Sequence, residues 1–271
     1  MDNEPRNDTI PPQPPAPGTL QPRIEVVEVP DYKPVVTYAI LGVTVFVWLL
    51  QMATLYWIHI PGLPAHVDIP AALGMKDNAA ILAGQYWRLF TPMLLHDDLL
   101  PLHIITNMYF LVVVGARLEK FTGHRRFLLL YIVAGFAGNV MSFLFSPENS
   151  LGASTALFGL MGAQLVFVLQ NRPFLAGNGR AALQNILVLI GLNLFIGIAL
   201  GFVDSWGHVG GLVGGLAFAW FGGVKLAPQE VAYPRFRLVD TRGLSEEMLG
   251  SMLVAVVFGG FAVLKILGIA F

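Results

Sequence analysis

The feature that most constrains this chain is a series of apolar runs without charged side chains, each about as long as a membrane-crossing helix. A helix needs about 20 apolar residues to cross the roughly 30 Å hydrocarbon core of a bilayer. Seven runs fit that length: Val36–Ile58, Leu99–Ala116, Phe127–Phe145, Leu151–Gln170, Ala181–Val203, Ser205–Val224 and Met248–Leu264. The sequence therefore predicts an all-α polytopic membrane protein.

Composition agrees with a membrane location and excludes several other classes of protein. The 271 residues are 55% hydrophobic and 12% charged, against roughly 25% charged residues in soluble domains. The formal net charge of −1 offers no strongly basic surface, so we expect no nucleic-acid partner. Because the chain has no cysteine, it has no disulfide, no thiolate metal site and no thiol nucleophile.

The basic side chains are unevenly distributed between the two sides of the predicted bundle. Thirteen of the 16 Lys and Arg residues fall in the N-terminal tail and in the loops after the second, fourth and sixth runs. Since loops rich in Lys and Arg stay in the cytoplasm, the pattern predicts a cytoplasmic N-terminus and an external C-terminus. A bacterial inner membrane is the expected location, and the charge pattern alone leaves a eukaryotic membrane open.

The same patterns divide the chain into regions. Residues 1–34 hold nine of the 18 prolines and predict a disordered cytoplasmic tail. Residues 35–225 are expected to form a core of six transmembrane helices with an external loop at 59–98. Residues 226–247 then form a cytoplasmic linker, and residues 248–271 a seventh transmembrane helix. The oligomeric state is not indicated by any of these features.

Polar side chains inside apolar runs are costly and mark candidate functional positions. Four lie near the outer ends of three runs: His103, Asn107, Ser154 and His208. A histidine, with an ordinary pKa of about 6.5, makes a neighbouring serine hydroxyl nucleophilic by taking its proton. Side-chain N–H donors stabilise the oxyanion that forms when serine attacks a carbonyl group. These residues together predict acyl transfer near the outer surface, where water is available.

Small residues predict how Ser154 and His208 come together. The sixth run carries glycine pairs at GxxxG spacing between Gly207 and Gly215, and such a face allows close approach of two helices. The fourth run offers a matching surface of small residues: Gly152, Ala156, Gly159 and Ala163. We therefore expect these two helices to pack closely and to bring Ser154 within hydrogen-bond distance of His208.

Two further polar groups have more than one interpretation. His96, with its neighbours Asp97 and Asp98 and with His103, suggests a metal site, although water-exposed loop residues are the favoured interpretation. Asp204 lies one turn before His208 and suggests a third catalytic residue that orients the imidazole. A turn residue facing water is the favoured interpretation of Asp204.

The motifs, taken together, resemble the rhomboid intramembrane serine proteases. The matching segments, in the order and spacing of that family, are Trp87-Arg88, His103-Ile104-Ile105-Thr106-Asn107, Gly152-Ala153-Ser154 and Gly207-His208-Val209-Gly210-Gly211. The resemblance covers residues 36–224. It implies a six-helix rhomboid-like bundle, with the seventh C-terminal helix outside the shared core, and no metal or organic cofactor.

The resemblance also implies roles for single residues. Ser154 would be the nucleophile and His208 the general base, in a pair that needs no acidic third member. His103, Asn107 and the Ser154 backbone N–H would form the oxyanion hole. Supporting positions implied by the same resemblance are Phe158, Gly152, Trp87, Arg88 and the acidic Glu119.

The implied function is that of an intramembrane serine endopeptidase, whose partners are the lipid bilayer and transmembrane protein substrates. One position departs from the family pattern, because Thr155 follows the serine where glycine is common, and its branched side chain limits close approach. That departure keeps open a non-catalytic rhomboid-like binder of membrane proteins. A small-solute transporter is a further alternative, although no internal repeat or interrupted run supports it.

Overall fold

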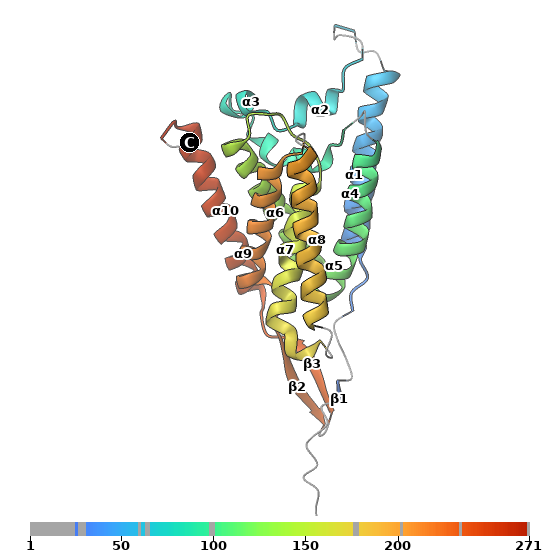
Figure 1. Cartoon of the computed structure of the whole chain (residues 1–271), viewed down its shortest axis with the longest axis vertical. Coiled ribbons are helices and arrows are strands. Elements are labelled where there is room, and N and C mark those ends of the chain that lie inside the picture. Colours follow the sequence, from blue (N-terminus) through green and yellow to red (C-terminus); the bar gives the residue numbers. More distant parts are fainter. Residues whose placement is uncertain are drawn as a thin grey trace, which may run out of the picture.

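A computed structural model describes residues 25–26, 31–58, 61–62, 66–97, 101–175, 179–200, 203–232 and 235–269. Helices occupy most of these residues and form a bundle, with short helices at one end and a small sheet at the other (Figure 1). We call the end with α2 (Ile69–Gly74) and α3 (Asn78–Leu82) the loop end, and the opposite end the sheet end. Most of the tail predicted to be disordered lies outside the described residues.

Six helices in the described part of the chain are long and apolar enough to cross a membrane. They are α1 (Val35–Tyr56), the continuous helix made of α4 (Pro101–Phe110), η3 (Leu111–Gly115) and α5 (Ala116–Thr122), then α6 (His124–Phe145), α7 (Ser154–Asn171), α8 (Gly179–Leu200) and α10 (Leu244–Ile266). A short turn, η4 (Arg172–Phe174), follows α7. The chain is a multi-pass membrane protein, as the apolar runs predict.

The sixth apolar run forms α9 (Ser205–Gly222), which is not one of these six helices. Its six glycines and His208 lower its hydropathy. The glycines of α9 do not face the surroundings of the bundle. They pack against α6, α7 and α10. Six of the seven predicted spans thus correspond to long apolar helices, and the remaining one, formed by α9, stays a prediction.

The helix of the second run continues past its predicted end at Ala116 to Thr122. It can do so because the charged Glu119 in its last turns is hydrogen-bonded inside the protein. Glu119 is completely buried, and its carboxylate accepts hydrogen bonds from the Val36 N–H at 2.9 Å and from the Thr37 N–H at 2.7 Å. The His124 ring lies 2.6 Å from the same carboxylate. These bonds tie the end of α5 to the start of α1.

Close contacts at glycine join α9 to its neighbours. A Cβ atom added to Gly162 of α7 would lie 2.7 Å from the Leu212 carbonyl oxygen of α9. A Cβ atom on Gly210 of α9 would lie 2.5 Å from the Met141 Cβ atom of α6. The predicted close packing of the fourth and sixth runs is confirmed, and the glycine face of α9 contacts α6 as well as α7.

The long loop between α1 and α4 folds into short helices that rest on the loop end of the bundle. They are α2, α3, η1 (Tyr86–Leu89) and η2 (Thr91–Leu94). The Arg88 guanidinium donates to the Met75 carbonyl at 2.8 Å and to the Ala72 carbonyl at 2.6 Å. Trp87 Nε1 donates to the Leu73 carbonyl at 2.9 Å. Trp87 and Arg88 thus fasten η1 to α2.

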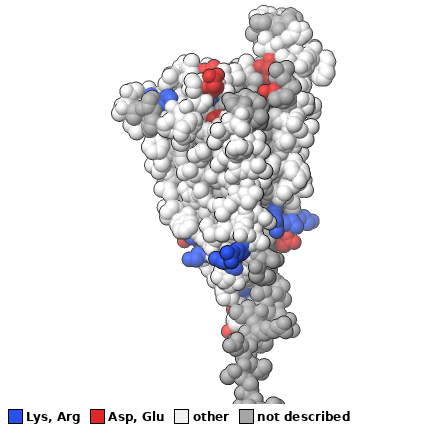
Figure 2. Space-filling model, in the orientation of Figure 1, with Lys and Arg blue, Asp and Glu red and all other residues white. Residues whose placement is uncertain are grey.

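The linker between α9 and α10 contains two strands that the sequence did not predict. β2 (Leu226–Ala232) pairs antiparallel with β3 (Arg235–Asp240), and β1 (Glu25–Val26) pairs parallel with β3. The buried Leu226 and Leu238 side chains give this sheet a small apolar cluster with Val224. Lys and Arg side chains gather toward the sheet end (Figure 2), which is the end predicted to face the cytoplasm.

Candidate active site

Ser154 and His208 lie side by side at the loop end of the bundle. Ser154 is the first residue of α7, and His208 lies in the first turn of α9. The Ser154 Oγ and His208 Nε2 atoms are 2.9 Å apart, a hydrogen-bond distance. His208 is buried. Two residues separated by 54 positions in the sequence are thus brought into direct contact.

The turn before Ser154 requires glycine. The fourth run was expected to be helical from Leu151, but α7 begins only at Ser154 because Gly152 adopts a φ of +135°, which a right-handed helix excludes. The Gly152 N–H donates to the Pro92 carbonyl at 2.9 Å. A Cβ atom on Gly152 would lie 3.0 Å from His103 Nε2 and 3.6 Å from Ser154 Oγ. The missing side chain therefore lets His103 approach this turn.

Phe158 and Asp204 determine the surroundings of the His208 ring. The Phe158 ring stacks on the imidazole with centroids 4.2 Å apart and planes inclined by 19°. Asp204 caps α9 by accepting the Gly207 N–H at 2.9 Å, while His208 Nδ1 is buried and has no hydrogen-bond partner among the described residues. Asp204 is thus a turn residue, as favoured, although it is half-buried and does not face water freely.

The other two predicted site residues lie on α4. His103 Nδ1 accepts the Asp97 N–H at 3.4 Å, so in the neutral ring Nε2 carries the proton and is the donor. Asn107 is buried one turn further along, and its Nδ2 donates to the His103 carbonyl at 2.8 Å. The described contacts bring His103 to the Gly152 turn, whereas this Asn107 bond stays within its own helix.

His96 is a part of the site that sequence reasoning missed. Its interpretation as a water-exposed loop residue is wrong, because its side chain is completely buried. His96 Nε2 accepts the Ala153 N–H at 3.5 Å, and its ring lies 5.1 Å from the His103 ring, centroid to centroid. Burial, with a smaller effect of His103, lowers the pKa of His96 to about 3, so the ring is neutral at pH 7. The apolar run Met93-Leu94-Leu95 immediately before it was the available signal.

Lys76 fixes the connection that leads from α6 to Ser154. Its side chain is completely buried, and Nζ donates to the Ser146 carbonyl at 2.8 Å and to the Glu148 carbonyl at 2.6 Å. Its backbone also pairs with that of Ser150 in both directions. Burial lowers the pKa of Lys76 to about 8, which leaves mostly ammonium at pH 7. Lys76 was not among the site residues predicted from the sequence, because a lysine in a loop is ordinarily exposed.

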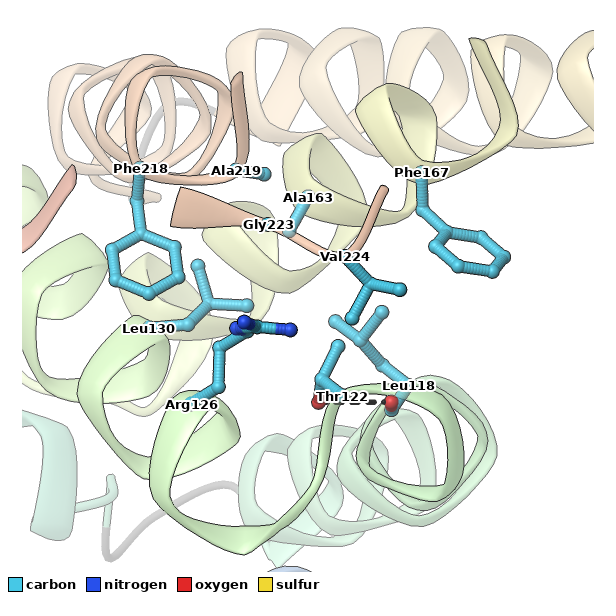
Figure 3. A pocket seen from close by; sticks show the side chains of 10 residues that line it. All are labelled: Leu118, Thr122, Arg126, Leu130, Ala163, Phe167, Phe218, Ala219, Gly223 and Val224. Carbon is cyan, nitrogen blue, oxygen red and sulfur yellow. Dashed lines mark hydrogen bonds between the residues drawn. The ribbon is translucent and has the colours of Figure 1, made fainter. Parts of the chain in front are cut away.

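No group of three or more His, Asp or Glu residues in the described ranges could hold a metal ion. A small hollow occurs at the sheet end, between α5, α6, α7 and α9 (Figure 3). Its lining is mostly apolar, with the Arg126 side chain beside Leu130 and Phe218. It lies at the opposite end of the bundle from Ser154 and His208, and neither residue lines it.

Thr155, the departure from the family pattern, fits between two glycines. Its side chain is buried, and its Cγ2 atom would lie 3.0 Å from a Cβ atom on Gly138 of α6 and 3.1 Å from one on Gly207 of α9. The branched side chain therefore fills space between helices that only glycines leave open. Its hydroxyl oxygen is buried and has no hydrogen-bond partner in the described part of the chain.

We predict that Thr155→Ala leaves the reactivity of Ser154 nearly unchanged and lowers the free energy of unfolding by about 1 kcal/mol, the cost of one lost buried methyl group. Losing the unpaired hydroxyl should cost nothing further. Thermal unfolding in detergent and labelling by a serine-reactive fluorophosphonate measure the two quantities. A folded variant with strongly reduced labelling would show that Thr155 acts on the serine directly.

The fold and the site together define a class of protein: a multi-pass membrane protein in which a half-buried serine and a buried histidine are paired at one end of a helix bundle. The Rhomboid domain matches residues 83–225, which are 143 of the 271 residues, and the chain belongs to the Rhomboid family. Both Ser154 and His208 fall within the matched residues. The seventh apolar run, α10, falls outside them.

Individual relatives agree with this assignment. The chain is 39% identical to rhomboid protease GluP of Bacillus subtilis strain 168 over 183 residues, which are 68% of this chain and 34% of that protein. It is 36% identical to the mitochondrial RHOMBOID-like protein 6 of Arabidopsis thaliana over 167 residues, 61% of this chain and 52% of the relative. RHOMBOID-like protein 1 of the same plant is 43% identical over 153 residues, 56% and 38% of the two chains. The matches thus span about a third to a half of each relative's length.

Proposed function

We propose that this chain is an intramembrane serine endopeptidase that cleaves transmembrane or juxtamembrane segments of other membrane proteins. The observation that carries the proposal is the 2.9 Å contact between Ser154 Oγ and His208 Nε2 inside a Rhomboid domain. A relative of this chain is named a rhomboid protease. No cofactor takes part in the proposed reaction.

The reaction begins with attack of Ser154 Oγ on the carbonyl carbon of the scissile peptide bond. Neutral His208 takes the hydroxyl proton at Nε2 and passes it to the leaving amine, which breaks the C–N bond and leaves an acyl-enzyme. Water then attacks the ester, His208 takes a proton from that water, and the proton returns to Ser154. Stacking on Phe158 keeps the imidazole in the plane that this transfer needs.

The oxyanion is proposed to bind between His103, Asn107 and the backbone N–H of Ser154. His103 Nε2 lies close to the Gly152 turn. Because Nδ1 of the same ring accepts the Asp97 N–H, the proton of the neutral ring is on Nε2, which can donate it to the oxyanion. Asn107 Nδ2 uses one N–H for the His103 carbonyl and has a second for the oxyanion. Donors fixed in place before reaction stabilise the developing charge without reorganisation.

Asn107→Ala is expected to lower the turnover number by about 10²–10³, the usual loss for one oxyanion donor. The Michaelis constant should change little, because the bond strengthens only as charge develops. Steady-state cleavage of a membrane-embedded reporter separates the two constants. An unchanged turnover number would remove Asn107 from the oxyanion hole and leave the protease assignment standing.

The reaction rate should fall in acid, because protonated His208 cannot accept the serine proton. Activity is therefore expected to be higher at pH 8 than in acid, and to decline once the pH falls below the pKa of His208. His96, with a pKa of about 3, stays neutral across this range and does not add to the acid limb. The rate of fluorophosphonate labelling from pH 4 to 8 measures this dependence, and a rate in folded protein that is the same at pH 4 as at pH 8 would contradict a histidine base.

The proposed topology places the loop end and the active site on the outer side of the membrane. The six long apolar helices, with α9 as a further span, cross the bilayer, and the sheet end faces the cytoplasm. The Lys and Arg side chains at the sheet end support this orientation (Figure 2). A bacterial inner membrane suits it, and substrates would approach the Ser154 pair through the bilayer.

Reconstitution into proteoliposomes tests the proposed function. Wild type and Ser154→Ala would be incubated with a panel of single-span reporter proteins whose spans carry small residues near the outer end. Cleavage by wild type alone, at a site in or beside the span, is the expected result. Binding of the reporters without cleavage would replace the protease with a non-catalytic binder of membrane proteins.

A further inference from the structure

The helix α10 lies outside the Rhomboid domain, yet one of its faces is buried in the bundle. The buried residues recur every three or four positions, and they are Glu247, Gly250, Ser251, Val254, Phe258 and Ala262. The opposite face carries exposed apolar side chains such as Met252 and Val256. One face of α10 is therefore fitted to the protein and the other to its surroundings.

The buried face of α10 contacts α9, the helix that carries His208. A Cβ atom on Gly250 would lie 2.8 Å from the Phe218 carbonyl oxygen, and one on Gly222 would lie 2.9 Å from the Glu246 carbonyl oxygen. Nearer to His208, Val254 Cγ1 lies 3.7 Å from the Cβ position of Gly214. The two helix backbones are thus packed without an intervening side chain.

An ion-pair cluster fixes α10 at the sheet end. Glu247 is buried and lies 2.9 Å from Arg125 Nε and 3.0 Å from Arg126 Nη2. Arg126 is buried too, forms a second ion pair with Asp240 of β3, and lies beside Phe218 of α9 (Figure 3). Since buried charges are stable only when paired, this cluster joins α6, α9, β3 and α10 as one unit.

A single lysine fixes α10 at the loop end. Lys265 Nζ donates to the Leu144 carbonyl at 2.7 Å and lies 5.1 Å from the centroid of the Phe143 ring. Leu144 is in the last turn of α6, where carbonyl groups lack helical partners and favour a cation. The next residue, Phe145, packs against Trp206 with ring centroids 4.8 Å apart and planes inclined by 36°, and Trp206 precedes His208 by two positions.

We propose that α10 is a positioning helix for the Ser154 and His208 pair. It contacts the two helices that hold the pair in place. One is α9, which carries His208, and the other is α6, from whose end the chain continues to Ser154. Because α9 meets α6 and α7 largely through glycine, few of its side chains interlock with those helices to hold its height and rotation. Packing against α10 supplies a third contact that holds α9 in place. This inference rests on the proposed protease function.

The test compares one substitution at two glycines of α10. Gly250→Leu forces α10 away from Phe218 and Gly222, whereas Gly260→Leu, with nothing within 4 Å of its Cβ position, adds the same side chain to the exposed face. Cleavage is measured per active site, with sites counted by fluorophosphonate titration. A merely structural role changes the number of sites, whereas a positioning role changes turnover at each site.

We expect Gly250→Leu to lower the turnover number per titrated site at least about tenfold, since misplacement of about 1 Å costs up to about 10²-fold. The Michaelis constant should stay constant, and Gly260→Leu should match wild type. If Gly250→Leu does not fold, Gly250→Ala and Lys265→Met take its place, with the same expected direction. Equal turnover per site in all variants would overturn the positioning role, whereas inactive, folded wild type would overturn the protease function itself.

Discussion

His208→Ala is expected to reduce the cleavage rate of a membrane-embedded reporter by about 10⁴-fold or more. Removing the base from a serine–histidine pair leaves only the catalysis that oxyanion donors and substrate binding provide. In this protein, His208 Nε2 at 2.9 Å from Ser154 Oγ is the base in contact with the hydroxyl. Neutral His96 cannot take over, because its Nε2 accepts the Ala153 N–H.

A matched control for this loss is His66→Ala. His66 lies between α1 and α2 and is exposed, and its ring nitrogen contacts the Leu55 carbonyl 2.9 Å away. Its replacement should leave the rate near that of wild type. Single-turnover cleavage in proteoliposomes, with thermal unfolding to establish that both variants fold, gives the comparison. Residual activity within tenfold of wild type in His208→Ala would rule out His208 as the general base.

Gly152→Ala should produce the second large loss, of at least about a hundredfold in turnover. Two costs add at this position. A φ of +135° is unfavourable for any residue with a Cβ atom, at about 1–3 kcal/mol. The new methyl group would also lie 3.0 Å from His103 Nε2 and 3.6 Å from Ser154 Oγ, so that relief of strain moves the nucleophile or its oxyanion donor.

Gly84→Ala separates the cost of backbone strain from the cost of crowding His103 and Ser154. Gly84 has a φ of +97°, and its Cβ position has no atom within 4 Å. We therefore expect Gly84→Ala to lower the thermal midpoint much as Gly152→Ala does, while turnover per titrated site stays close to that of wild type. Equal loss of turnover in both variants would show that backbone strain alone, without crowding of the site, explains the Gly152 effect.

Much of the fold was predictable because a bilayer permits few solutions. The long apolar runs gave the helices α1, α6, α8 and α10 to within a few residues, since hydrocarbon thickness fixes the length of a span. The end of α5 was not predictable in this way. A charged residue was expected to end the span, but the buried Glu119 carboxylate accepts hydrogen bonds from the start of α1, so the helix continues. The strands β2 and β3 were also missed, since short strands at the edge of a bundle lack a strong period.

The contact between Ser154 and His208 was predictable, because both residues are polar and lie inside apolar runs. His96 and Lys76 were missed for a common reason, which is that both lie in the loop between α1 and α4 and are buried only by tertiary packing. Sequence periodicity gives no information about how such a loop folds back on the bundle. The same holds for α10, whose two anchors at Glu247 and Lys265 depend on contacts with distant helices.

The most direct test of the proposed chemistry is covalent labelling of detergent-purified protein by a serine-reactive fluorophosphonate, with the modified residue located by peptide mapping. Wild type should be labelled at Ser154, and both Ser154→Ala and His208→Ala should lose the label while they remain folded. Labelling of another serine, or no labelling of folded wild type, would contradict an activated Ser154 supported by His208.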